Sequence, residues 1–389
     1  MALSTSFTNN KIKDNITPLH LVYCSKCYLL QLNHNYDFNA LYGDNYGYRS
    51  GINKSMNNHL KNIVKEIENI VKIKKNDVIL DIASNDGTLL KKYSKKNTIK
   101  IGIDPTIRKY KNLYPSNIIK SPTFFTKKQF NLLSNKKKAK IITSIAVFYD
   151  VPNPNIFIND IKNILDKNGV WILEQSYFPF LIKNNAYDSV CHEHITYFTI
   201  YQINLILTKF QLQIFNINYN SMNGGSIRLF IKHKSCTIYK KNIYNINKFK
   251  NSEKYYFENF ITIKKKFINN ILLSREKLIN LIKKISKNNE IIHIYGASTK
   301  GNIILQFCGI TSKDIQYVSD RNPLKIGKFT PGSNIKIISE KESRKLNPNY
   351  YLVMPWHFKD EFIAREKEFL DKGGKFIFPF PNITISHRS

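Results

Sequence analysis

The sequence lacks the features that would place a protein in a membrane or a secreted class. None of its apolar runs approaches the roughly 20 residues that a helix needs to cross a bilayer. The first residues, Met1 to Phe7, show no basic stretch followed by an apolar one, as a secretory signal would. Five cysteines, three of them isolated, are too few for a disulfide framework. We therefore expect a protein of the reducing cytoplasm, without a membrane partner.

Arginine and acidic residues are also scarce, although lysine is abundant. The 389 residues include 60 lysines and arginines against 28 aspartates and glutamates, a formal net charge of +32, yet only about eight of them are arginines. Nucleic-acid-binding surfaces usually cluster their basic residues and use arginine, whose planar group grips phosphate with two donors. Here the lysines are scattered among asparagines and isoleucines, as an AT-rich genome would supply. We therefore expect no nucleic-acid partner, and the surplus charge would help to attract an anionic substrate.

Hydrophobic residues make up 42% of the chain and aromatic residues 13%, enough for well-packed cores. The length predicts two or three domains at roughly 100–200 residues per domain. Between residues 54 and 235, short apolar runs alternate with amphipathic stretches, which is typical of a parallel sheet with crossover helices. The expected strands are residues 77–82, 100–104, 140–148 and 170–174, and the expected helices are residues 54–75, 156–166 and one beginning near Thr88.

A second, smaller unit of the same kind is predicted after residue 290. Its expected strands are residues 291–296, 316–320, 350–354 and 375–378, and residues 250–290 predict one long lysine-rich connecting helix. The predicted fold is therefore α/β with three parts. These are a small N-terminal module over residues 1–53, a Rossmann-like domain over residues 54–235, and a C-terminal Rossmann-like domain over residues 236–389.

A loop of small and acidic residues, Asp81-Ile-Ala-Ser-Asn-Asp-Gly87, follows the first predicted strand. Small residues there let the backbone approach a ligand closely, and Asp104, at the end of the next strand, can accept both hydroxyls of a ribose. The loop lacks the full glycine pattern of dinucleotide sites, and Asp86 would repel a pyrophosphate. A positively charged nucleoside, S-adenosylmethionine, is therefore the favoured ligand. The candidate cofactor-binding residues are Asp81, Ala83, Asn85, Asp86, Gly87 and Asp104.

A dense group of ionisable side chains lies in Tyr187-Asp-Ser-Val-Cys-His-Glu-His194, with Tyr197 just after it. His194 can act as a general base near neutral pH if a nearby carboxylate orients it. The spacing differs from the H-E-x-x-H of zinc proteases. A buried, satisfied polar cluster is the structural alternative. The candidate catalytic residues are Cys191, Glu193, His194 and Tyr197.

Another loop, Tyr295-Gly-Ala-Ser-Thr-Lys-Gly301, lies between a strand and an apolar helix of the second unit. Hydroxyl groups, a lysine and a helix N-terminus predict an anion-binding loop whose natural guest is a diphosphate. The order of residues is not that of a P-loop. The candidate substrate-binding residues are His192, Asn223, Ser298, Thr299, Lys300 and Arg321.

Together these segments resemble the three-domain S-adenosylmethionine-dependent sugar C-methyltransferases, over nearly the whole chain. The best-understood members of that family methylate C3 of nucleotide-linked 4-keto-deoxysugars. The segments that carry the resemblance are Cys24-Ser-Lys-Cys27, Tyr48-Arg-Ser-Gly51 with His59, Asp81 to Gly87, Gly102-Ile-Asp-Pro105, Cys191-His-Glu-His194, Asn223-Gly-Gly-Ser226, Tyr295 to Gly301, Asp320-Arg-Asn-Pro323 and Met354-Pro-Trp-His357.

The resemblance implies that His194 is the general base and that Glu193 is its companion in the active site. The loop from Asp81 to Gly87, with Asp104, would hold the methyl donor, and the C-terminal domain would help to hold a nucleotide-linked sugar. A carbonyl at C4 acidifies the proton on C3, so a neutral histidine can remove it. The resulting enolate would attack the donor's methyl group, helped by positioning and by donors near its oxygen.

The chain departs from that family at two places. Family members usually carry two CxxC pairs that bind structural zinc, whereas here only Cys24 and Cys27 are present. Two thiolates are half of a tetrahedral site, so even with His20 or His34 we expect no complete zinc site. Cys191 stands where the characterised sugar 3-C-methyltransferases have a tyrosine, which leaves the sugar and the methylated position open.

Two other functions remain compatible with these residues. One is a methyltransferase with another acceptor, such as a sugar oxygen. The other is a non-catalytic or RNA-associated binding protein that keeps the fold and uses its lysine-rich surface. The sequence does not predict the oligomeric state, and a monomer is compatible with it.

Overall fold

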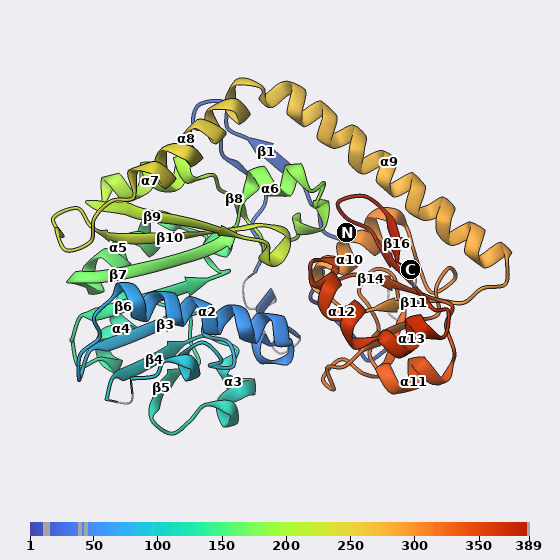
Figure 1. The fold of residues 1–389 in the computed structure, drawn as a ribbon, viewed down its shortest axis with the longest axis horizontal. Coiled ribbons are helices and arrows are strands. Elements are labelled where there is room, and N and C mark those ends of the chain that lie inside the picture. Colours follow the sequence, from blue (N-terminus) through green and yellow to red (C-terminus); the bar gives the residue numbers. More distant parts are fainter. Residues whose placement is uncertain (11–15, 38–40, 43–45, 96, 387–389) are drawn as a thin grey trace.

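The computed structural model describes residues 1–10, 16–37, 41–42, 46–95 and 97–386. Within them, two α/β units stand side by side, and a long helix runs from one to the other (Figure 1). Both units have largely parallel sheets, which confirms the predicted fold class. None of the described helices is both long and apolar enough to pass through a membrane.

The first unit is built on a seven-stranded sheet with the order β5-β4-β3-β6-β7-β10-β9. Its strands are β3 (Val78–Ile82), β4 (Ile99–Ile103), β5 (Ile118–Ser121), β6 (Ala139–Ile145), β7 (Leu165–Ser176), β9 (Leu212–Asn220) and β10 (Ser226–His233), of which the last two pair antiparallel. All of β3 is buried, because its apolar run is covered on both faces. The strand order reverses between β3 and β6, where sheets of this kind bind ligands.

Helices cover both faces of this sheet. They are α2 (Lys54–Ile70), α3 (Ile107–Tyr110), α4 (Lys127–Leu133), α5 (Pro154–Ile164), α6 (Phe178–Lys183) and α7 (Ile200–Lys209). The predicted helix near Thr88 is wrong, because only a single 3₁₀ turn forms there, over Leu90–Lys92. The Asp86 carboxylate accepts a hydrogen bond from the backbone N–H of Thr88 in a local turn. The lysine-rich residues that follow have no apolar stripe that would support a longer helix.

The C-terminal unit contains a six-stranded sheet with the order β13-β12-β11-β14-β15-β16. The four predicted strands are β11 (Ile292–Tyr295), β12 (Tyr317–Asp320), β14 (Tyr350–Val353) and β15 (Lys375–Phe378), and the sequence did not indicate β13 (Lys336–Ser339) and β16 (Thr384–Ser386). Its helices are α10 (Thr299–Cys308), α11 (Glu340–Lys345), α12 (Lys359–Arg365) and α13 (Lys367–Asp371).

The connector is two helices rather than the single one that we predict from the sequence. They are α8 (Ile243–Glu258) and α9 (Phe260–Lys287), with the break at Asn259. The Glu253 carboxylate in α8 accepts the backbone N–H of Ile200 at 2.6 Å, which ties α8 to the first unit. From the break, α9 crosses to the C-terminal unit (Figure 1). The break at Asn259 therefore separates the helix that packs on the first unit from the helix that crosses to the C-terminal unit.

The N-terminal residues contact both units. Strands β1 (Leu21–Tyr23) and β2 (Leu30–Leu32) form a small sheet with β8 (Thr196–Tyr197) of the first unit. Before them, the chain is buried against the C-terminal unit, where Ala2 N–H donates to Gln306 Oε1 at 2.7 Å. The predicted module therefore holds the two units together.

Candidate active site

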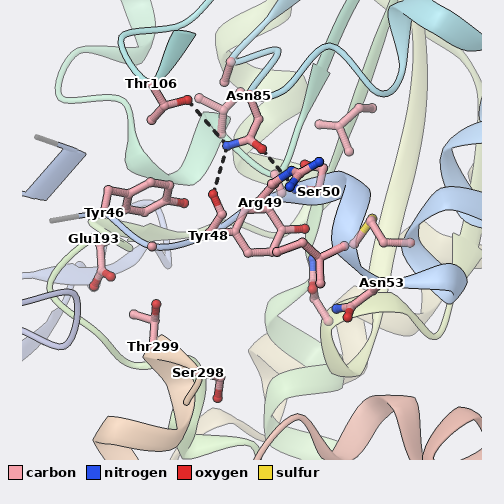
Figure 2. Close-up of a pocket in the computed structure, with 18 of the residues that line it drawn as sticks. Tyr46, Tyr48, Arg49, Ser50, Asn53, Asn85, Thr106, Glu193, Ser298 and Thr299 are labelled. Atoms are coloured by element: carbon pink, nitrogen blue, oxygen red, sulfur yellow. Dashed lines mark hydrogen bonds between the residues drawn. The ribbon is translucent and has the colours of Figure 1, made fainter. Parts of the chain in front are cut away.

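A cavity of about 670 Å³ lies between the carboxyl ends of the two sheets. One wall follows the ends of β3, β4, β6 and β7, and the opposite wall follows the ends of β11, β12 and β14. Residues 46–53 complete the enclosure. Figure 2 shows side chains from all three parts of the chain around this space. Here the wall at the ends of β3, β4, β6 and β7 is called the first edge, and the wall at the ends of β11, β12 and β14 is called the second edge. Because both edges open into one cavity, two ligands bound there would meet.

The first edge is held in shape by Asp104. Its Oδ2 accepts the backbone N–H of Asn85 at 2.9 Å, and its Oδ1 accepts the backbone N–H of Thr106 at 2.6 Å. Burial raises the pKa of the Asp104 carboxyl, against the hydrogen bonds that it accepts. Burial also raises the pKa of nearby Asp81 to about 7, although the Thr143 hydroxyl donates to it. Both carboxylates line the cavity, as the predicted donor site requires.

The second edge repeats the same arrangement. Asp320, at the end of β12, accepts the backbone N–H of Ala297 at 2.7 Å and that of Asn322 at 2.7 Å. Each unit therefore uses an aspartate at the end of its second strand to hold the loop after its first strand. The repeat supplies a matched pair, Asp104 and Asp320, for mutagenesis.

Residues 46–53, here called the strap, run between the two edges. On the first edge, the Asn85 side chain accepts the backbone N–H of Ser50 at 2.9 Å (Figure 2). Asp86 accepts the backbone N–H of Gly51 at 3.0 Å. On the second edge, Asn322 Nδ2 donates to the Gly47 carbonyl at 3.0 Å. The strap thus joins both edges while it closes the cavity.

Two predicted donor-site residues support the strap or the loop instead of lining the cavity. Asp86 is turned to the strap, where it also forms an ion pair with Arg49 at 3.2 Å. Gly87 has φ +72° and lies so close to Tyr114 that a Cβ would fall 2.7 Å from the ring. Sequence reasoning missed Arg49 and Ser50 as cavity residues, because their partners lie more than 30 residues away.

The His194 side chain lines the cavity. Its Nδ1 lies 2.8 Å from the Ser189 carbonyl oxygen, which can only accept, so Nδ1 carries the hydrogen and Nε2 keeps its lone pair. The Tyr149 ring packs against the imidazole with 4.3 Å between centroids. Burial, together with the charge of Lys300, lowers the pKa of His194 to about 3. The side chain is therefore a neutral proton acceptor across the physiological pH range.

We expect the His194 ring to show no titration between pH 5 and 8, because burial and the nearby lysine oppose its protonation. Carbon-13 labelling of the histidines and NMR spectra across that range would test this, with His194→Asn to assign the signal. A His194 resonance with a midpoint near the ordinary value of about 6.5 would contradict the structure.

The other residues of the histidine cluster divide into two groups. Glu193 and Cys191 line the cavity, and the Glu193 carboxylate accepts a hydrogen bond from Ser4 Oγ at 2.8 Å. Burial raises the pKa of both side chains. Tyr197, a predicted catalytic residue, and His192, a predicted substrate-binding residue, do not line the cavity.

Tyr197 packs against residues 187–194, here called the histidine loop, where its hydroxyl donates to the Ser189 carbonyl at 3.4 Å. His192 faces the N-terminal segment, with Nε2 3.0 Å from the Thr17 hydroxyl and its ring edge-on to Tyr36. Successive residues of a short turn point in different directions, so His192 and His194 cannot share the cavity. Both Tyr197 and His192 can act only through the residues that they support.

Apart from His192, the predicted substrate-binding residues all reach the cavity, four from the second edge and Asn223 from the first unit. Thr299 and Asn223 line it, and Arg321 lies beside the strap, where it donates to the Asn53 side chain. The Ser298 hydroxyl is already used, because it caps α10 by accepting the Gly301 N–H at 2.9 Å. Lys300 turns away from the helix N-terminus and reaches the loops of the first unit.

A buried charge network lies in the cavity wall at the end of β7. The Glu174 carboxylate accepts hydrogen bonds from His59, from Asn220 at 3.1 Å and from Arg228 at 2.8 Å. Burial alone would raise the pKa of Glu174, but the hydrogen bond from His59 and the charge of Arg228 together lower it. The network keeps Glu174 ionised inside the fold, and Arg228 extends it to Glu66.

The cysteine pair lies in the turn between β1 and β2. Cys24 is exposed and Cys27 is half-buried. In the described part of the chain, no three histidine, cysteine, aspartate or glutamate side chains gather where a metal ion could bind. The donor set present does not fit a tetrahedral zinc site, which needs four ligands.

Both α/β units of the chain match known methyltransferase families. Residues 54–216 match the family described as methyltransferase domain, and residues 221–381 match the family described as C-methyltransferase C-terminal domain. The chain is 26% identical over 369 residues to C-methyltransferase NovU from Streptomyces niveus, covering 95% of this chain and 87% of that protein.

Solved structures resemble smaller parts of the chain. A chain from the complex of the Haloferax volcanii Trm112 methyltransferase activator with a methyltransferase is 11% identical, at a TM-score of 0.38, covering 51% of this chain and 98% of that one. The plantazolicin methyltransferase BpumL is 15% identical, at a TM-score of 0.36, covering 45% of this chain and 83% of that one. From the two family matches, which together cover both α/β units, the chain is an S-adenosylmethionine-dependent methyltransferase.

Proposed function

We propose that this enzyme transfers the methyl group to a carbon atom of a nucleotide-linked keto-deoxysugar. The observation that carries the proposal is that His194, whose Nδ1 is held by the Ser189 carbonyl, lines a cavity reached by the carboxyl ends of both sheets. A carbon acceptor needs a base to remove its proton, and a carbonyl next to that carbon makes the removal feasible. The C-methyltransferase match of the C-terminal part and the name of NovU support a carbon acceptor.

The first edge suits the methyl donor. Asp81 and Asp104 place carboxylates there, and the loop from Asp81 to Gly87 contains no lysine or arginine. Such an edge favours a nucleoside with a positive charge over a dinucleotide. When bound, S-adenosylmethionine supplies an electrophilic methyl group on a positively charged sulfur. The chain's own residues hold the loop and form one wall of the cavity with the strap.

The second edge suits the nucleotide end of the acceptor. Thr299, Arg321 and Asn322 line that side of the cavity, with hydrogen-bond donors for phosphate and ribose oxygens. His194 would then take the proton from the carbon next to the carbonyl. The electron pair moves to the carbonyl oxygen, and the carbon forms its new bond to the methyl group.

Methyl-transfer assays with a labelled donor and a panel of nucleotide-linked 4-keto-deoxysugars test the proposal. The same sugars without the nucleotide serve as controls. We expect a product one methyl group heavier only from a nucleotide-linked keto-sugar. Methylation of sugars that lack the carbonyl would point to an oxygen acceptor. No transfer, together with no binding of S-adenosylhomocysteine, would point to a non-catalytic protein.

Replacing Asp104 with alanine is expected to weaken S-adenosylhomocysteine binding by about 10- to 100-fold, since hydrogen bonds to a charged group contribute about 1.5–3 kcal/mol. Isothermal calorimetry would measure the dissociation constant. Asp320→Ala is the matched control, because Asp320 accepts the same two kinds of backbone N–H on the other edge. Equal weakening in both variants would show that the donor does not occupy the first edge.

A further inference from the structure

Lys300 links the C-terminal unit to two loops of the first unit. Its Nζ donates to the Ser189 hydroxyl at 3.0 Å and to the Asn223 carbonyl at 2.9 Å. Both partners belong to the first unit, 111 and 77 residues away in the chain. A lysine that served a phosphate at the start of α10 would stay beside that helix end, whereas this one is held across the cavity.

The base and the lysine are anchored on the same residue. The Ser189 carbonyl oxygen accepts the Nδ1 hydrogen of His194 at 2.8 Å, while the Ser189 hydroxyl accepts from Lys300. Lys300 and His194 both line the cavity. A lysine has three N–H donors, and among the described residues two acceptors are recorded for Lys300. One donor is therefore left for a ligand next to the base.

We propose that Lys300 donates a hydrogen bond to the substrate oxygen that becomes negative when His194 removes the adjacent proton. This inference rests on the proposed carbon methylation. As the C–H bond breaks, its proton goes to Nε2 of His194, and its electrons form the carbon–carbon double bond of an enolate. The carbonyl electron pair moves to the oxygen beside Lys300. The enolate carbon then bonds to the methyl group, whose bond to sulfur breaks.

The charges around Lys300 favour the reacting state over the resting one. In the resting site, the lysine lowers the pKa of His194 and of His357, which also lines the cavity, after the larger effect of burial. In the reacting state, the enolate oxygen would lie between the Lys300 ammonium group and the protonated His194. The negative oxygen would attract both cations, which would repel each other in its absence. Stabilisation that appears only as charge develops accelerates the chemical step.

Solvent deuterium exchange into the substrate tests the assignment, because it reports proton removal without methyl transfer. The keto-sugar nucleotide is incubated in D₂O with the enzyme and S-adenosylhomocysteine, and mass spectrometry follows the uptake of deuterium. Removing one oxyanion donor commonly costs about 10²–10³-fold in rate, so we expect that loss for Lys300→Met. We expect the KM for the sugar nucleotide to change less than about threefold, as a group that acts mainly in the transition state predicts.

Ser189→Ala is the second variant, because it removes the hydroxyl but keeps the carbonyl that orients His194. We expect it to slow exchange by about tenfold, as the loss of one hydrogen bond of about 1.4 kcal/mol would. Unchanged affinity for S-adenosylhomocysteine serves as the check on folding in both variants. A KM raised tenfold or more with normal exchange would instead assign Lys300 to the diphosphate and overturn the proposal. Wild-type enzyme that neither exchanges nor methylates any keto-sugar would reject the proposed function itself.

Discussion

Replacing His194 with asparagine is expected to lower kcat by about 10³-fold, within the range that general-base catalysis contributes. The asparagine amide can still donate to the Ser189 carbonyl, so the loop keeps its main contact, but no nitrogen lone pair faces the cavity. Affinity for S-adenosylhomocysteine should stay unchanged, because the base acts only in the chemical step. Steady-state kinetics and calorimetry would measure the two effects separately.

His357→Asn is the matched control for this variant. His357 also lines the cavity, and burial with the charge of Lys300 lowers its pKa to about 3 as well. It belongs to the C-terminal unit, and within the described residues no hydrogen bond to the histidine loop is recorded for it. We expect His357→Asn to reduce kcat far less. Near-normal turnover in His194→Asn, with a large loss in His357→Asn, would move the base to the other histidine.

Glu174→Gln is expected to lower the free energy of unfolding by about 3 kcal/mol, near the lower limit for breaking a buried ion pair. The change leaves Arg228 and His59 beside a neutral amide inside the fold. Urea denaturation of the full chain would measure the loss. Glu66→Gln is the control, because Glu66 also pairs with Arg228 but its side chain is 27% exposed.

The Glu66–Arg228 pair is only partly buried, and Arg228 keeps Glu174 as a partner when Glu66 is changed, so we expect Glu66→Gln to cost about 1 kcal/mol. Equal losses in the Glu174 and Glu66 variants would show that burial does not set the strength of this network. A stable Glu174 variant with impaired donor binding would instead make the network part of the ligand site.

The features that the sequence predicted correctly are those set by neighbours in the chain. Strand β3 and the aspartate that ends β4 follow from apolar runs and their boundaries, because burial of alternate or continuous apolar residues is a local pattern. The sequence predicts that a carboxylate orients His194, but the structure places the Ser189 backbone carbonyl there, five residues earlier in the chain. The predicted helix near Thr88 failed where a local side-chain hydrogen bond competes with helix formation.

Contacts between distant segments were not predictable in this way. Ser4 reaches Glu193 across 189 residues, and Lys300 reaches Ser189 across 111. Only the packing of the two units against each other sets those distances. The sequence neighbours of Lys300 therefore predict a phosphate loop, whereas in the structure Lys300 and His194 both contact Ser189.

The most direct test of the account uses a donor labelled with carbon-13 in the methyl group. The product from a nucleotide-linked keto-sugar would be examined by two-dimensional NMR, which distinguishes a methyl group on carbon from one on oxygen. The account predicts that the labelled carbon is bonded to the ring carbon next to the carbonyl. A labelled methoxy signal would contradict it, because an oxygen acceptor requires no enolate and leaves the paired positions of His194 and Lys300 without a function.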